Sequence, residues 1–148
     1  MEGWNALSMS IGLLYVVPVI GFLTTWDLFH IRVAVALVST LFFGEAIKHF
    51  VIGKASPRPP GARDCNLWCN DGARGGEPGM PSTHTSNVVL FSVLYGSYTE
   101  NPWIRAGLVL YAVLMMMSRY QKQCHTLSQI LAGAALGGGV GWCVRYRA

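Results

Sequence analysis

The sequence predicts an all-α membrane protein, a multi-pass bundle of about five transmembrane helices. Only 12% of its 148 residues are Asp, Glu, Lys or Arg, about half of the roughly 25% that is usual in soluble domains. Hydrophobic residues make up 52% of the chain, and its mean hydropathy is +0.38. A water-soluble fold of this size needs more charge on its surface. The composition therefore excludes a soluble two-domain enzyme and a disordered tail.

Long stretches without a formal charge locate the helices. Residues 3–26, 78–99 and 123–144 each run for at least 22 residues without one, and a membrane crossing needs about 20. Two shorter stretches reach that length when Glu45, Lys48 and Arg105 lie near helix ends. The predicted helices cover residues 4–25, 30–52, 83–99, 102–119 and 124–144. They leave no room for a second domain, so residues 1–148 form one domain whose long loop is 54–83.

The charges also predict how the bundle is oriented. Glu2 is the only charged residue before the first span, so this span has no basic leader segment and is expected to be retained. Arg145 and Arg147 at the other terminus favour a cytosolic C-terminus. With an odd number of spans, loop 54–83 then faces away from the cytosol. The raw cation count opposes this orientation, and an anion-binding site on the loop side would explain the excess.

Arg58 stands within the long loop between Pro57, Pro59 and Pro60. Each proline restricts its own backbone and that of the residue before it. We therefore expect Arg58 to be held in place; the alternative is a flexible polar linker with a stray arginine.

Ser82 is a candidate N-cap for the third predicted helix. The amides of Thr83 and His84 would then lack helical partners at the positive end of the helix dipole, which is an anion-binding arrangement. His84 lies in the first turn, where it would meet the bound anion. The alternative is an ordinary cap followed by an interfacial histidine.

Arg119 ends one predicted span and His125 opens the next after a tight turn. Gln129 follows His125 by four residues and lies on the same helical face, so its carbonyl can accept the Nδ1 proton of the imidazole. Nε2 is then left unprotonated. A nucleophile with an orienting partner is half of a catalytic triad.

Antiparallel spans place these three clusters at one membrane face. Two arginines, two histidines and a helix start favour a phosphate site, in which arginine binds the oxygens, one histidine attacks and the other protonates the leaving group. A metal site would have carboxylates in place of the arginines. No metal and no cofactor is expected.

The clusters resemble the three motifs of the type-2 phosphatidic acid phosphatase superfamily: Lys-x6-Arg-Pro, Pro-Ser-Gly-His and Ser-Arg-x5-His-x3-Asp. The matching segments are Arg58-Pro59, Pro81-Ser82-Thr83-His84 and Ser118-Arg119 with His125. Gln129 stands where most of the superfamily has aspartate, and this makes the chain similar to the dolichyl-diphosphatase branch. The similarity covers roughly residues 44–140.

The resemblance implies a role for each site residue. His125 would form a phosphohistidine, Gln129 would hold its tautomer, and His84 would act as acid and base. Charge on the phosphate would be stabilised by Arg58, Ser82, Thr83, Arg119 and a lysine. The family spacing would place that lysine at Val51, so either Lys48 or Lys54 must serve. Lys48 would need three inserted residues and is spaced to pair with Glu45.

The expected substrate is dolichyl diphosphate, hydrolysed to dolichyl phosphate and inorganic phosphate on the lumenal side of the endoplasmic reticulum membrane. Two alternatives stay open: a broader lipid or polyprenyl phosphatase, and an inactive family member that serves as a membrane interaction protein. Nucleic-acid binding is not expected, because the cations are few and already assigned. Gly133, Gly137 and Gly141 predict close helix packing, within the chain or in a homo-oligomer. Cys65 and Cys69 are candidates for a disulfide.

Overall fold

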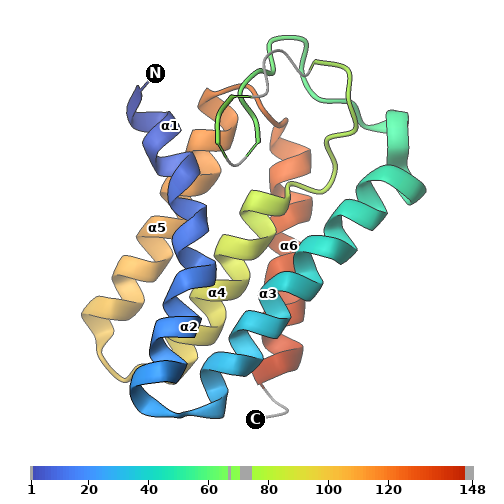
Figure 1. Cartoon of the computed structure of the whole chain (residues 1–148). Helices are drawn as coiled ribbons and strands as arrows, with labels where there is room; N and C mark the ends of the chain where they lie inside the picture. Colours follow the sequence, from blue (N-terminus) through green and yellow to red (C-terminus); the bar gives the residue numbers. More distant parts are fainter. Residues whose placement is uncertain (1, 67, 71–74, 146–148) are drawn as a thin grey trace.

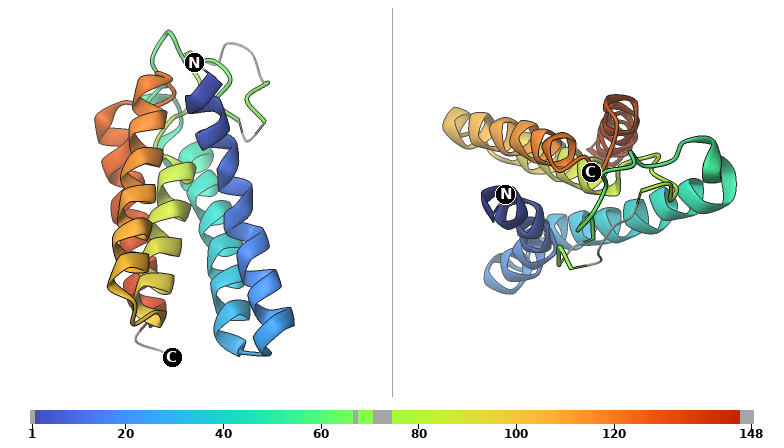
Figure 2. Two further views of the ribbon diagram at one scale, coloured as in Figure 1. Left: turned by 90° about the vertical axis from the view of Figure 1, so that its left-hand side faces the viewer. Right: turned by 90° about the horizontal axis from the view of Figure 1, so that it is seen from above.

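The computed structural model describes residues 2–66, 68–70 and 75–145, and within these it contains helices and connecting segments but no strand. The helices run roughly along one common axis (Figures 1 and 2). In chain order they are α1 (Glu2–Met9), η1 (Ser10–Gly12), α2 (Leu13–Thr25), α3 (Leu28–Ala46), η2 (Ile47–Ile52), η3 (Gly53–Ala55), α4 (Thr83–Tyr98), α5 (Pro102–Gln121) and α6 (Leu127–Arg145). The predicted all-α bundle is confirmed.

The helix boundaries follow local signals. Trp26 adopts a left-handed conformation that ends α2, and Asp27 caps α3 by accepting a hydrogen bond from the amide of Phe29 at 2.8 Å. Asn101 caps α5 in the same way through the amide of Trp103. The last helix begins at Leu127, three residues later than predicted, because the turn after α5 includes Gln123 with a φ of 56°.

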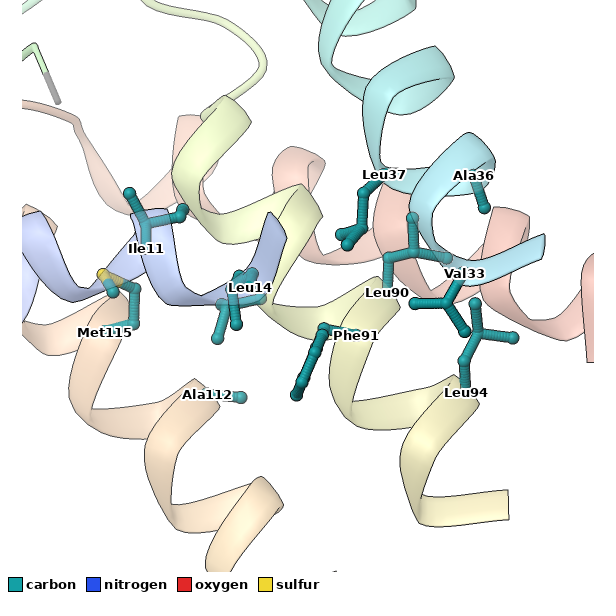
Figure 3. Close-up of a cluster of buried hydrophobic side chains, with 11 residues drawn as sticks. Ile11, Leu14, Val33, Ala36, Leu37, Leu90, Phe91, Leu94, Ala112 and Met115 are labelled. Atoms are coloured by element: carbon teal, nitrogen blue, oxygen red, sulfur yellow. The ribbon is translucent and has the colours of Figure 1, made fainter. Parts of the chain in front are cut away.

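Helix α4 is the centre of the bundle, and it packs against α6, α5 and α3. Figure 3 shows the apolar core that surrounds it. Leu90, Phe91 and Leu94 of α4 meet side chains from four other segments. Those partners are Ile11, Leu14, Val33, Ala36, Leu37, Ala112 and Met115.

The glycine stripe on α6 packs against α4 of the same chain. A Cβ atom on Gly133 would lie 2.4 Å from the carbonyl oxygen of Ser82, and one on Gly137 would lie 2.0 Å from that of Ser86. Any side chain at either position would push the two helices apart. Of the two alternatives for this stripe, packing within the chain is the one that the structure shows.

Among the residues that the structure describes, three helical segments are long and apolar enough to cross a membrane, namely Glu2–Thr25, Leu28–Ala55 and Leu127–Arg145. Large apolar side chains on their outer surfaces are exposed, as with Leu23 at 62% and Phe42 at 69%, which is the pattern of a surface that faces lipid. Helix α4 has 16 residues, fewer than the roughly 20 that a membrane crossing needs. Its first turns carry buried polar side chains. Because neighbouring helices cover it, α4 need not be apolar.

The segment between η3 and α4 covers the end of the bundle at which α1 begins, opposite the end of α6 (Figures 1 and 2). Its two arms pair through the backbone, since the amide of Arg58 donates to Glu77 at 2.7 Å and that of Gly79 to Ser56 at 2.9 Å. A disulfide joins Cys65 to Cys124 in the α5–α6 turn. The two candidate cysteines of the loop are therefore not bridged to each other, because folding brings Cys124 next to Cys65 and leaves Cys69 as a free thiol.

Candidate active site

A cavity of about 310 Å³ lies at the loop end of the bundle, between the loop and helices α2, α3 and α4. The charged, titratable and hydroxyl side chains that line it include Glu45, Lys48, Arg58, Thr83, His84 and His125. Its lining also includes Tyr15 and Asn87 and, as apolar side chains, Ile11 and Leu41. The cavity thus brings together residues from all three sequence clusters.

His125 is 2% exposed and is fixed through Nδ1. This nitrogen lies 2.9 Å from the carbonyl oxygen of Gly79 and 3.3 Å from Oε1 of Gln129. Both neighbours can only accept, so Nδ1 carries the proton and Nε2 the lone pair. Burial, followed by the positive charge of Arg119, lowers the pKa of His125 well below its ordinary value. The imidazole is therefore neutral at neutral pH and suited to nucleophilic attack.

Gln129 connects His125 to the loop. Its Oε1 accepts from His125, as predicted, and also from the amide of Thr126 at 3.1 Å. Its Nε2 donates to the carbonyl oxygens of Ser56 and Pro57, at 3.2 and 2.8 Å, and lies 3.1 Å from the hydroxyl of Ser56. A carboxylate could not donate these bonds, which gives a physical reason for glutamine at this position.

Gly79 is required by the same arrangement. A Cβ atom here would lie 2.7 Å from both Oε1 and Nε2 of Gln129. The backbone of Gly79 also accepts from His125 and donates to Ser56. A larger residue would displace the Gln129 amide that holds His125.

His84 lies in the first turn of α4, and its Nε2 is buried without a hydrogen-bond partner in the described part of the chain. Ser82 occupies the N-cap position as predicted, but its side chain makes no capping bond and instead accepts from Thr85 at 3.1 Å. The first intrahelical bond runs from Ser86 to Ser82. The amides of Thr83, His84 and Thr85 are the donors that a helix start leaves over, whereas the amide of Ser82 donates to the carbonyl oxygen of Gln129 at 3.1 Å.

Lys48, and not Lys54, lies in the cavity wall. Lys48 is 2% exposed, Lys54 is exposed, and Val51, at the family spacing, is 76% exposed. Between Lys48 and Arg58 the chain has three residues more than the family spacing. They are accommodated where the wide π-helical turn η2 is followed by η3, whose three residues begin at Gly53 with a φ of 51°. Only glycine adopts that backbone conformation readily.

Glu45 brings a carboxylate into the cavity. Its Oε1 accepts from Lys48 at 2.5 Å and from the hydroxyl of Thr83 at 2.9 Å, and its side chain is 39% exposed. The helical pairing of Glu45 with Lys48 is confirmed. Lys48 and Thr83, which were predicted to bind phosphate, thus bind a carboxylate of the chain itself.

The two arginines occupy different positions. Arg58 lines the cavity, and its Nε lies 3.5 Å from the carbonyl oxygen of Pro78. Arg119 is fully buried outside the cavity lining and donates to the Ser8 hydroxyl and, at 2.7 Å, to the carbonyl oxygen of Cys65. Arg119 therefore anchors the loop and acts on His84 and His125 through its charge.

Sequence reasoning missed Glu45 as a cavity residue and also Tyr15, Gly79 and Asn87. The signal for Asn87 was available, because it is a polar residue on the face of His84 within an uncharged stretch. Among the described residues, no group of three or more His, Cys, Asp or Glu side chains is placed to hold a metal ion.

Comparison with known proteins supports the relation that the motifs suggested. A lipid A 4'-phosphatase from Bacteroides thetaiotaomicron is 28% identical over 123 residues, which are 77% of this chain and 55% of that protein. The chain thus spans about half the length of this relative. No solved structure matches the chain significantly. The family model of the PAP2 superfamily matches residues 29–148, the segment that contains all three clusters, and the chain therefore belongs to the PAP2 superfamily.

Proposed function

We propose that this protein is an integral-membrane lipid phosphatase that works through a phosphohistidine. The observation that carries the proposal is the state of His125, whose Nδ1 is held by Gly79 and Gln129 in the wall of a cavity that Lys48 and Arg58 also line. A fixed neutral imidazole beside two cations fits attack on a phosphate.

In the first step, Nε2 of His125 attacks the phosphorus, and the bond from phosphorus to the leaving oxygen breaks. His84 gives its proton to that oxygen. The negative charge of a bound phosphate favours protonation of His84 beforehand. In the second step, His84 takes a proton from water, the water oxygen bonds to phosphorus, and the phosphorus–nitrogen bond to His125 breaks. Inorganic phosphate is released and both histidines return to their starting states.

Charge on the transferred phosphoryl group would be stabilised from several sides. Lys48, Arg58 and the hydroxyl of Thr83 line the cavity directly. The amides of the first turn of α4, for which the helix itself offers no acceptor, and the buried charge of Arg119 add to the positive potential. Ser82, whose side chain is fully buried, would act through the helix start.

The substrate is proposed to be a lipid, because the cavity is walled in part by Ile11 and Leu41 from helices whose outer faces are apolar. The motif resemblance, with Gln129 in place of aspartate, favours dolichyl diphosphate, cleaved to dolichyl phosphate. The Cys65–Cys124 disulfide supports a site in an oxidising compartment, as the lumen of the endoplasmic reticulum is. A second candidate is a phosphorylated glycolipid, which the relation to a lipid A 4'-phosphatase favours.

The test is phosphate release by detergent-purified protein from dolichyl diphosphate, a phosphorylated glycolipid and phosphatidate. We expect His125→Ala to lower the rate by about 10⁴-fold or more and His84→Ala by about 10² to 10⁴. His30→Gln is the matched control, since His30 is buried at the other end of the bundle beside Tyr95. Equal rates in all variants, or no phosphate release from any of the lipids, would refute the proposed phosphatase activity. Either result would favour an inactive membrane interaction protein.

A further inference from the structure

Asn87 is a buried polar residue that the proposed chemistry does not use. Its side chain is 1% exposed, and its Nδ2 donates to the hydroxyl of Tyr15 at 2.8 Å. Its Oδ1 is buried without a hydrogen-bond partner in the part of the chain that the structure describes. A buried acceptor without a partner destabilises the fold unless a ligand or water completes it. Both residues line the cavity that contains the two histidines.

The position of Asn87 indicates what would complete it. It follows His84 by three residues on α4, so the two side chains lie on the same helical face, one turn apart. In the proposed reaction His84 meets the leaving oxygen, on the side of the phosphorus opposite His125. Whatever is attached to the leaving oxygen therefore extends toward Asn87 and Tyr15. Ile11 and Leu41 line the same cavity and suit the start of a lipid chain.

We propose that Asn87 and Tyr15 form a neutral hydrogen-bonding subsite for a polar group attached to the leaving oxygen. This inference rests on the proposed function. The group is the inner phosphate of a lipid diphosphate or a sugar hydroxyl of a phosphorylated glycolipid. Both groups fit, because the hydroxyl of Tyr15 can accept from the Asn87 amide or donate to it. In the arrangement observed, Asn87 offers Oδ1 to a substrate hydroxyl; with the amide turned over, Tyr15 donates to Oδ1, and Nδ2 is offered to a phosphate oxygen.

The subsite has a consequence for specificity. A lipid monophosphate whose leaving group is a plain prenyl alcohol has no polar group to place there. It gains no hydrogen bond and leaves the Asn87 amide incomplete. The enzyme should therefore prefer a diphosphate over a monophosphate that carries the same chain.

The experiment compares kcat/KM for farnesyl diphosphate, farnesyl monophosphate and a phosphorylated glucosamine glycolipid. Asn87→Leu keeps the size of the side chain and removes both polar atoms. We expect it to lower kcat/KM about tenfold or more on the substrate that uses the subsite and less than about threefold on the monophosphate. Tyr15→Phe should act in the same direction with a smaller effect, and because it removes only a hydroxyl it tests the inference should Asn87→Leu fail to fold. Whichever of the diphosphate and the glycolipid shows the loss identifies the group that is bound.

Ser92→Ala is the matched control, because Ser92 also ties α4 to a neighbouring helix, through the carbonyl oxygen of Leu108 at 3.0 Å, but lies outside this cavity. It should leave the ratio between substrates unchanged. Equal losses on all substrates in the Asn87 and Tyr15 variants would mean a structural or water-orienting role and would overturn the subsite, as would no loss on any. In either case an active wild type keeps the proposed function. A wild type that is inactive on every substrate overturns both.

Discussion

The two walls of the cavity differ in how far their histidines are hydrogen-bonded within the protein. On the loop side, His125 is held by Gly79 and Gln129, and Gln129 is in turn bonded to Ser56 and Pro57. On the helix side, His84 and Asn87 present buried atoms without partners in the described chain. The orientation of His125 is thus fixed before any substrate arrives, whereas His84 and Asn87 keep hydrogen-bonding atoms that a substrate can use.

The difference fits the chemistry that we propose for each wall. A nucleophile gains from being fixed in advance, because misorientation directly lowers the rate of attack. Groups that bind the leaving side gain from being incomplete, because the substrate then completes them. Substitutions in the loop wall should therefore lower kcat, and substitutions in the helix wall should also change substrate or phosphate affinity.

Among the substitutions of residues that support the two histidines, the largest effect should come from Lys48. Lys48→Ala removes the buried cation of the helix wall and should lower kcat/KM about 10²- to 10³-fold. Lys54→Ala is the matched control, because Lys54 is exposed and outside the cavity. Phosphate release under subsaturating substrate measures both. The reverse ranking would reassign the family lysine to Lys54.

Gly79→Ala should break the loop wall. The new Cβ would lie 2.7 Å from the amide atoms of Gln129, so the amide and the Gly79 backbone that accepts from His125 are pushed apart. His125 then loses its alignment. We expect kcat to fall about 100-fold with KM changed little. Gly96→Ala is the control, since nothing lies within 4 Å of a Cβ at that position. An unchanged kcat in Gly79→Ala would mean that the preset geometry of His125 is not needed.

Gln129→Ala should be milder than Gly79→Ala. It removes the bond of 3.3 Å from His125 and keeps the shorter bond of 2.9 Å to the carbonyl of Gly79. The orientation of the imidazole is then weakened but not lost, and we expect a fall in kcat of about tenfold. Single-turnover rates give the value. A loss as large as that of His125→Ala would show that Gln129, and not Gly79, dominates the orientation.

The smallest expected effect is a gain in phosphate affinity and not a loss of activity. Glu45→Gln removes the carboxylate that binds Lys48 and Thr83, so an incoming phosphate no longer meets a negative charge. We expect the inhibition constant of inorganic phosphate to fall about 3- to 10-fold. His49→Gln is the control. It removes the imidazole that lies 3.4 Å from the other carboxylate oxygen of Glu45, and it keeps the carboxylate itself. Weaker inhibition by phosphate in Glu45→Gln would mean that Glu45 serves mainly to position Lys48.

Much of this site could be predicted because the relevant signals are local. The helix start at Thr83, the pairing of Lys48 with Glu45 and the four-residue step from His125 to Gln129 each depend on a few neighbouring residues. The disulfide partner of Cys65 could not be read in this way, because Cys124 lies 59 residues away. The bond from His125 to Gly79 was missed for the same reason, since it spans 46 residues.

By itself, the sequence determined the helical membrane fold, the approximate helix boundaries and the membership in a phosphatase family, because charge spacing and short motifs are properties of the chain. Tertiary structure decided which lysine enters the cavity, which cysteines pair and which histidine is held by the protein. It also placed Asn87 beside Tyr15 from another helix. These outcomes depend on how α4, the loop and α6 approach one another, and backbone approaches as close as that between Gly137 and Ser86 arise only when the helices pack.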